Sequence, residues 1–158
     1  VPLPILYNTS GYEKAEMVDE LADYADMYMP DFKFAESDLA QAQASAPEYP
    51  KVALKALVRM VQQKGFLDRP LTARAPAQSG VFVRHLVLPG HVSNSTKTLQ
   101  VLFDTFGTDI PINLMSQFWP ARRQKDSALN RRLRAHEFEE VVSYARDFGF
   151  TNLLIQSL

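Results

Sequence analysis

Short apolar runs alternate with amphipathic segments along the whole chain, and this alternation restricts the fold more than any other feature of the sequence. We predict strands at residues 3–7, 27–29, 81–88, 112–115 and 152–156. A helical segment is predicted after each of the first four strands. Because a strand, a helix and the next strand pack as a right-handed βαβ unit, repeated units build a parallel sheet. We therefore predict an α/β fold with parallel strands and a single domain over residues 1–158.

The helices are predicted from apolar stripes and from residues that favour helix ends. Three of them cover about residues 51–64, 96–106 and 135–148. The first helix is predicted to follow Ser10, because Ser10 and Glu13 have the spacing of a capping box. Its buried face would carry Met17, Leu21 and Tyr24. Ser95 is predicted to cap the third helix, and residues 66–80 are predicted to form a loop because they hold turn formers and no periodicity.

Polar residues gather where the predicted strands end. They are Asn8, Thr9 and Ser10 after the first strand, Asp31 and Lys33 after the second, Ser116 and Gln117 after the fourth, and Gln156 in the fifth. Parallel α/β folds bind ligands at this C-terminal edge of the strands. Asp31 and Lys33 are two residues apart, so we expect both side chains on one face of their strand.

Arg84 lies within an otherwise apolar predicted strand. A buried charge without a partner costs on the order of several kcal/mol, so Arg84 needs a counter-charge. We predict that Asp31 supplies it. Two interpretations of this pair stay open: an ion pair that only closes the sheet, or part of a ligand-binding site.

The formal charge is distributed unevenly. Residues 1–50 hold ten acidic and two basic residues, a net charge of −8, whereas residues 51–158 hold fifteen basic and eight acidic ones, a net charge of +7. The most basic segment, Arg122–Arg134, would attract phosphates. It has neither interleaved aromatic residues nor a nucleic-acid-binding motif, so we interpret it as a solvated loop. A nucleic-acid-binding module is the least favoured of the functions considered.

The sequence contains no cysteine, which excludes a disulfide scaffold, a thiolate zinc site and an iron–sulfur cluster held by this chain alone. We predict no metal site from the residues present. No apolar run approaches the roughly 20 residues of a membrane helix, and Val1–Ile5 is unlike a secretory signal. A cytoplasmic protein without a membrane partner is therefore expected.

Five segments, taken in order, carry a family resemblance. They are Pro4–Tyr12 (PILYNTSGY), Tyr28–Lys33 (YMPDFK), Val83–Gly90 (VRHLVLPG), Asn113–Pro120 (NLMSQFWP) and Thr151–Gln156 (TNLLIQ). Together they resemble the C-terminal half of a radical S-adenosylmethionine protein, in the group similar to pyruvate formate-lyase activating enzymes. The resemblance implies a partial or full (β/α) TIM-like barrel that holds a [4Fe–4S] cluster and S-adenosylmethionine.

In such enzymes a 5′-deoxyadenosyl radical abstracts hydrogen from a partner, here a glycyl-radical-type protein. The CxxxCxxC and glycine-rich GGE-type motifs of the relatives are absent, so the resemblance implies that this chain begins after both. We expect the parent protein to carry the cluster cysteines before Val1 and this chain alone to be inactive. A partial barrel also leaves an open sheet edge, which favours self-association.

The resemblance implies cofactor-binding roles for Asn8, Thr9, Ser10, Asp31, Lys33, Arg84 and Gln117. Asn8, Thr9 and Ser10 match the loop that approaches the cofactor, and Asp31 and Lys33 match the pair that holds its methionine moiety. Arg84 matches a strand arginine near the same cofactor, and Gln117 falls near a position where many activases have histidine. No catalytic residue is assigned.

The alternative to a radical enzyme is a non-catalytic βα domain. Such a domain would bind a small anionic ligand at the strand ends through Lys33 and Arg84, without iron. The presence or absence of three cysteines before Val1 in the intact protein separates the two hypotheses.

Overall fold

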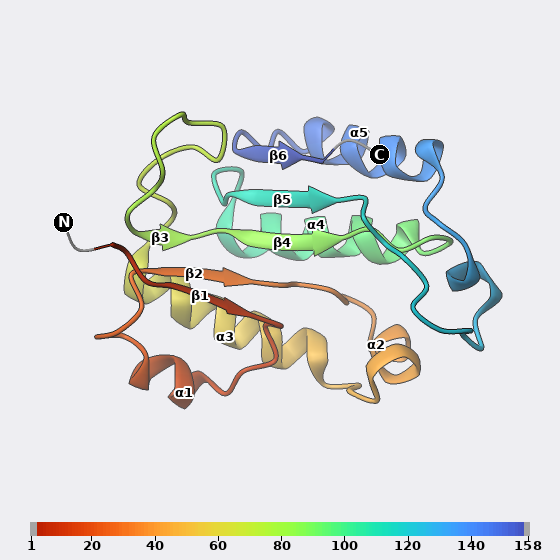
Figure 1. Ribbon diagram of the computed structural model, residues 1–158, viewed down its shortest axis with the longest axis horizontal. Helices are drawn as coiled ribbons and strands as arrows, with labels where there is room; N and C mark the ends of the chain where they lie inside the picture. The colour runs from red at the N-terminus through yellow and green to blue at the C-terminus, as the bar shows by residue number, and fades with distance from the viewer. Residues whose placement is uncertain (1–2, 157–158) are drawn as a thin grey trace.

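The computed structural model describes residues 3–156, with six parallel strands in two sheets and helices behind them in the view of Figure 1. The first sheet contains β1 (Leu6–Thr9), β2 (Met27–Pro30) and β3 (Gly80–Val81), in that order. The second contains β4 (Val83–Leu86), β5 (Ile112–Met115) and β6 (Leu153–Ile155), in that order. The helices are α1 (Ala15–Glu20), α2 (Ser37–Ala44), α3 (Tyr49–Lys64), α4 (Val92–Phe106) and α5 (Ala135–Asp147), with a 3-10 helix, η1, at Ser127–Asn130.

The two sheets meet where the end of β2 runs beside β4. An isolated parallel bridge pairs Asp31 with Arg84, and the Phe32 amide donates to the Arg84 carbonyl oxygen at 2.9 Å. On the other side of the break, the Phe82 amide donates to the Tyr28 carbonyl oxygen at 3.2 Å. β3 and β4 are therefore one interrupted strand, at the place of the third predicted strand. The predicted α/β fold with parallel strands is confirmed, and the strand order follows the chain as in part of a (β/α) barrel.

The two faces of the sheets differ in burial. Residues in register on parallel strands point to the same face. The face that packs on the helices holds the fully buried residues Tyr28, Val83, His85, Ile112 and Leu114. On β1, β2 and β4 the opposite face, which we call the open face, holds Leu6, Asn8, Met27, Met29 and Arg84, all exposed or partly exposed. On β5 the same face holds Asn113 and Met115, which are buried. Functional side chains on the β1, β2 and β4 part of the open face are therefore accessible.

The predicted start of the first helix is wrong. α1 begins at Ala15, and its N-cap is Lys14 rather than Ser10. Glu13 does not complete a capping box, because its carboxylate accepts hydrogen bonds from the Thr9 hydroxyl at 2.5 Å and from the Tyr7 hydroxyl at 3.4 Å. The chain is still turning there, with the Glu13 amide bonded to the Gly11 carbonyl oxygen at 2.9 Å.

The predicted buried face of the first helix is confirmed for Leu21, which packs against the core, and is wrong for Met17 and Tyr24. Val18 is fully buried, whereas Met17 is 46% exposed and Tyr24 is 71% exposed. The buried stripe of the helix lies one position later in the sequence than predicted, so Val18 faces the core in place of Met17. Tyr24 lies beyond the last residue of α1, where the periodicity no longer applies.

Three other boundaries also differ from the prediction. β1 begins three residues later than expected, and α2 at residues 37–44 is a helix that the sequence patterns do not predict. α4 begins at Val92, so Ser95 lies inside its first turn and is not the cap. The Ser95 hydroxyl is instead bonded to the buried His85 at 2.8 Å, a contact between α4 and β4 that the local sequence does not reveal.

Gly11 is required at the turn after β1, and this yields a first prediction. Its φ is +80°, and a Cβ atom built on it would lie 2.1 Å from the Asp31 carbonyl oxygen. We expect Gly11→Ala to lower the free energy of unfolding by more than the roughly 1–2 kcal/mol that a left-handed alanine costs, because the backbone of Asp31 must also move. Urea unfolding of the protein measures the loss.

Gly149→Ala is the matched control. Gly149 ends α5 with a φ of +86°, and a Cβ atom built on it would meet only Thr108 Cγ2 at 3.7 Å, an ordinary contact. This variant bears the cost of the backbone conformation without the clash. Equal losses of stability in the two variants would contradict the proposed close approach at Gly11.

Candidate functional site

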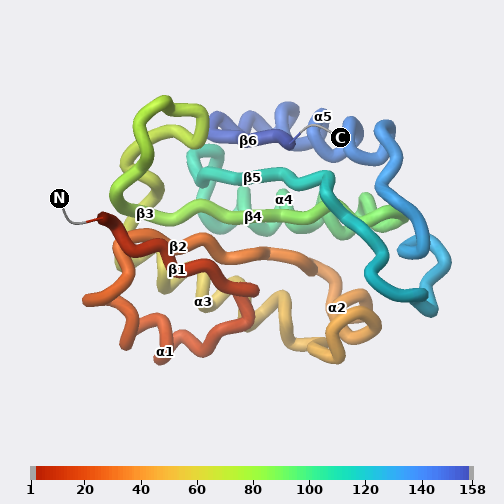
Figure 2. The backbone as a smooth tube through the Cα atoms, in the orientation of Figure 1, coloured from red at the N-terminus to blue at the C-terminus, as the bar shows by residue number. Residues whose placement is uncertain are grey.

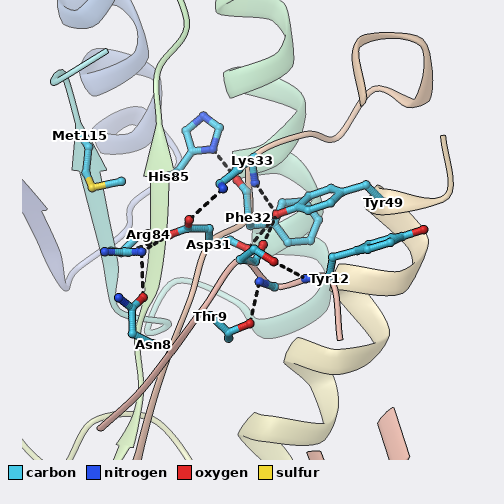
Figure 3. Close-up of polar contacts among 12 residues, drawn as sticks. Asn8, Thr9, Tyr12, Asp31, Phe32, Lys33, Tyr49, Arg84, His85 and Met115 are labelled. Carbon is cyan, nitrogen blue, oxygen red and sulfur yellow. Dashed lines mark hydrogen bonds and ion pairs between the residues drawn. The ribbon is translucent and has the colours of Figure 1, made fainter. Parts of the chain in front are cut away.

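Three charged side chains meet where β2 ends beside β4. The Arg84 Nε donates to Asp31 Oδ1 at 2.7 Å, and Arg84 Nη2 lies 2.6 Å from the same oxygen. The Lys33 Nζ lies 3.3 Å from the other oxygen, Asp31 Oδ2. Figure 3 shows the three side chains converging. The predicted ion pair between Asp31 and Arg84 is confirmed, and Asp31 and Lys33 lie close enough to interact, as their spacing predicted.

Burial differs among the three groups in a way that suits ligand binding. The Asp31 side chain is 12% exposed, Arg84 is 22% exposed and Lys33 is 40% exposed. Asp31 and Arg84 are therefore fixed by each other, whereas Lys33 keeps much of its ammonium group in contact with solvent. One carboxylate and two cations leave one net positive charge, which favours a ligand that carries an anionic group.

Asn8 extends the cluster to β1. Its side-chain oxygen accepts a hydrogen bond from Arg84 Nη2 at 2.9 Å. Asn8 and Arg84 both lie on the open face, so side chains from β1, from β4 and from the end of β2 contribute to one cluster. Of the seven residues predicted to bind a cofactor, the structure brings together Asn8, Asp31, Lys33 and Arg84.

The other three predicted residues have different contacts. The Thr9 hydroxyl is buried, donates to Glu13 at 2.5 Å and accepts from the Gly11 amide at 3.2 Å, so it shapes the turn after β1. Ser10 contributes its carbonyl oxygen to a hydrogen bond from the Tyr49 hydroxyl at 2.8 Å. Gln117 is exposed and contacts the Met115 sulfur at 3.6 Å. None of these hydrogen bonds involves a side chain of Asn8, Asp31, Lys33 or Arg84.

Tyr49, at the start of α3, is a residue that the sequence analysis missed. Its hydroxyl lies 2.8 Å from the Ser10 carbonyl oxygen and 2.9 Å from that of Asp31, and accepts from the Lys33 amide at 3.0 Å. A hydroxyl has one proton, so it donates to one of the two carbonyls at a time. Burial raises the pKa of the Tyr49 phenol, which therefore stays protonated. The Tyr12 ring stacks on the Tyr49 ring. This contact joins distant parts of the chain, so the local sequence gives no sign of the role of Tyr49.

His85 supports the cluster from the covered face. Its Nδ1 lies 2.7 Å from the Phe32 carbonyl oxygen, and its Nε2 lies 2.8 Å from the Ser95 hydroxyl. Since a carbonyl oxygen only accepts, Nδ1 carries the proton and Nε2 accepts from Ser95. The imidazole thus links β4 and α4 to the residue between Asp31 and Lys33.

Asn94 of α4 fixes the chain after Lys33. This buried side chain accepts from the amides of Ala35 at 2.9 Å and Glu36 at 3.3 Å, and donates to the Lys33 carbonyl oxygen at 2.9 Å. Backbone groups on both sides of Lys33 are therefore bonded to buried side chains. The position of the charged cluster is set before any ligand binds, which lowers the entropy that binding costs.

No cluster of three or more histidine, cysteine, aspartate or glutamate side chains within residues 3–156 has the arrangement of a metal site. The chain as a whole has no cysteine. Over the same described range, no helix is long and apolar enough to cross a membrane.

Comparisons with known proteins agree with this fold. An uncharacterised protein of Methanocaldococcus jannaschii is 23% identical over an alignment of 151 residues, which covers 93% of this chain and 39% of that protein. The crystal structure of a radical S-adenosylmethionine methyltransferase from Sphaerobacter thermophilus is similar with a TM-score of 0.65 and 17% identity, over 96% of this chain and 40% of that one. No family model matches the chain. The chain thus has the fold of part of a radical S-adenosylmethionine enzyme and spans about two fifths of either protein.

The buried His85 gives a second prediction. Burial lowers the pKa of its imidazole from 6.5 to about 4. The unfolded chain therefore binds a proton near pH 6.5, whereas the folded protein does not until the pH is near 4. Stability that is present above pH 6.5 should be lost as the pH falls toward 4, by up to roughly 3 kcal/mol.

Urea unfolding across this pH range measures the loss, and NMR of the imidazole ring measures the pKa directly. The ring signals of His85 should stay constant through pH 6.5 and begin to shift only near pH 4. A His85 signal that titrates at the ordinary pKa would show that the ring is not held as described.

Proposed function

We propose that this chain is the part of a radical S-adenosylmethionine enzyme that binds the amino-acid end of the cofactor. The observation that carries the proposal is the cluster of Asp31, Lys33 and Arg84 at the strand ends of a fold shared with such an enzyme. The methionine end of the cofactor is a zwitterion. The cluster offers a carboxylate to its ammonium group and a partly exposed ammonium to its carboxylate.

Each residue has a distinct role in this proposal. Asp31 accepts a hydrogen bond from the α-ammonium group, and Lys33 donates to the α-carboxylate. Arg84 holds the Asp31 carboxylate in place through two contacts to one oxygen, and Asn8 in turn orients the Arg84 guanidinium. Bound beside a reduced [4Fe–4S] cluster, S-adenosylmethionine supplies a radical for hydrogen abstraction. The iron–sulfur cluster does not fit the residues of this cysteine-free chain, so its thiolates would come from another part of the parent protein.

The reaction of the parent enzyme is the finer part of the proposal. The resemblance of the five sequence segments favours hydrogen abstraction from a glycyl-radical-type partner protein, as in an activating enzyme. The structural neighbour is a methyltransferase, so methyl transfer is the competing reaction. A protein-based radical seen by electron paramagnetic resonance would favour the first, and a methylated product the second.

A non-catalytic anion-binding domain is the second candidate function. The net positive charge of the cluster and the absence of cysteine from this chain favour it. Such a domain would bind simple carboxylates or phosphate as well as it binds S-adenosylmethionine. The zwitterion-binding arrangement predicts instead that the amino group of the ligand matters.

The third prediction concerns Lys33. Lys33→Ala should weaken binding of S-adenosylmethionine by about tenfold or more, because a charge-assisted hydrogen bond contributes about 1.5–3 kcal/mol. Decarboxylated S-adenosylmethionine lacks the group that Lys33 binds. The same substitution should therefore leave its affinity unchanged. Isothermal titration calorimetry measures both ligands.

Lys55→Ala is the control for this experiment, because Lys55 is an exposed lysine on α3. It should bind both ligands as the unmodified protein does. If Lys33→Ala bound S-adenosylmethionine as tightly as Lys55→Ala, the proposed role of Lys33 would be wrong. Equal competition by acetate, phosphate and methionine would favour the anion-binding domain.

The fourth prediction is that the 158-residue chain by itself does not cleave S-adenosylmethionine. The chain has no thiolate for an iron–sulfur cluster and hence no source of electrons for the cleavage. After anaerobic reconstitution with iron and sulfide and addition of a reductant, 5′-deoxyadenosine should not exceed the level without protein. Turnover above that level would mean that other side chains hold the cluster.

A further inference from the structure

A groove separates α2 from the basic segment that follows β5. Its volume is about 900 Å³. Glu36 and Asp38 lie on the α2 side, and Arg122, Arg123 and Lys125 lie on the other. Figure 2 shows α2 and this segment at the end of the molecule toward which β2, β4 and β5 run. The groove therefore lies on the same end as the charged cluster.

The basic wall of the groove is a fixed loop rather than a free chain. The Gln124 amide donates to Asn130 Oδ1 at 2.7 Å, and Asn130 Nδ2 donates back to the Gln124 carbonyl oxygen at 2.9 Å. His91 Nε2 lies 2.6 Å from Asp126 Oδ2, which ties the loop to the start of α4. The other oxygen of Asp126 accepts from the Ala128 amide at 2.9 Å and begins η1.

A second ion pair anchors the far end of the loop. Both guanidinium Nη atoms of Arg131 donate to the Glu137 carboxylate at 2.7 Å. Glu137 also accepts from the Gly90 amide at 2.7 Å and the Arg134 amide at 2.9 Å. These donors lower the pKa of Glu137 to about 2, so the anchor stays charged at neutral pH. The interpretation of Arg122–Arg134 as a merely solvated loop is thus incomplete.

The groove has more cations than partners for them. Arg122, Arg123 and Lys125 are exposed, and none forms an ion pair or a side-chain hydrogen bond with the residues that the structure describes. On the opposite wall Glu36 is already paired with Lys97 at 2.6 Å. A third carboxylate of the lining, Asp126, is hydrogen-bonded to His91 and to the Ala128 amide. Asp38 is therefore the one carboxylate of the groove that forms no ion pair among the described residues. Two guanidinium groups beside an ammonium group form a setting that matches the oxygens of phosphates and carboxylates.

The groove is connected to the charged cluster by one short segment. Lys33 belongs to the cluster and Glu36 to the groove wall, and Asn94 holds the backbone from one to the other. A ligand that occupies both places would have its reacting part at the strand ends and an anionic part in the groove.

We propose that the groove between α2 and Arg122–Asp126 binds an oxyanion group, phosphate or carboxylate, of a small-molecule ligand. This proposal rests on the groove alone and goes beyond the proposed function. Histidine is the only aromatic side chain that lines the groove within the described residues, so bases of a nucleic acid find no ring on which to stack. The volume suits a small ligand.

The test uses pyrophosphate and citrate as probes, with isothermal titration calorimetry at low ionic strength. The variant Arg122→Gln/Arg123→Gln/Lys125→Gln removes the three free cations and leaves the anchoring pairs intact. We expect at least one probe to bind the unmodified protein and its affinity to fall at least about tenfold in this variant. Rising salt should weaken the binding.

A matched control separates a site from a general charge effect. Lys51→Gln/Lys55→Gln/Arg74→Gln removes the same number of exposed cations elsewhere, and should change the affinity by less than about twofold. If both triple variants lost affinity equally, or if neither probe bound, the proposal would be overturned. Binding of a single-stranded RNA without binding of either probe would also overturn it.

Lys33→Ala distinguishes failure of this proposal from failure of the proposed function. If that substitution abolished probe binding and the groove variant did not, the anions would bind at the strand-end cluster. The groove proposal would then be wrong while the cluster kept its assigned role. If the groove variant lost probe binding and Lys33→Ala retained it, the groove would be a separate oxyanion site, whatever the fate of the cofactor proposal.

Discussion

The pairing of Arg84 with Asp31 is the interaction on which the architecture depends. The backbones of the two residues form the bridge between the two three-stranded sheets, and their side chains form an ion pair directly above it. Removal of Asp31 would leave the half-buried Arg84 guanidinium without a counter-charge among the described residues, whereas removal of Arg84 would leave Asp31 paired with Lys33 alone. The same contact thus joins the halves of the fold and sets the position of the candidate site.

Buried neutral groups, rather than further charges, hold this ion pair in place. Tyr49 bonds the Asp31 carbonyl oxygen and the Lys33 amide, His85 bonds the carbonyl oxygen of Phe32, and Asn94 bonds that of Lys33. Each is nearly inaccessible to water, and its hydrogen bonds satisfy backbone groups that would otherwise be costly to bury. The result is a rigid support whose only markedly solvent-exposed charge is that of Lys33.

The sequence predicts those features that follow from a local pattern or from one strong energetic requirement. Five strand positions follow from apolar runs, and the partner of Arg84 follows from the cost of an unpaired charge. Ser10, Tyr49 and His85 were beyond prediction because their roles depend on contacts between segments 39 or 53 residues apart. The oxyanion groove was missed as well, because Arg122 and Asp38 are brought to opposite walls only by the fold.

Apolar side chains border the charged cluster on the open face. On β1 and β2 this face carries Leu6, Met27 and Met29, and the charged side chains follow where β2 ends beside β4. Methionine packs against many shapes, and its sulfur is only a weak hydrogen-bond acceptor. Lys33 and Arg84 therefore lie beside an apolar stretch of the same face, so a ligand with a charged end and an apolar end would find both kinds of contact there.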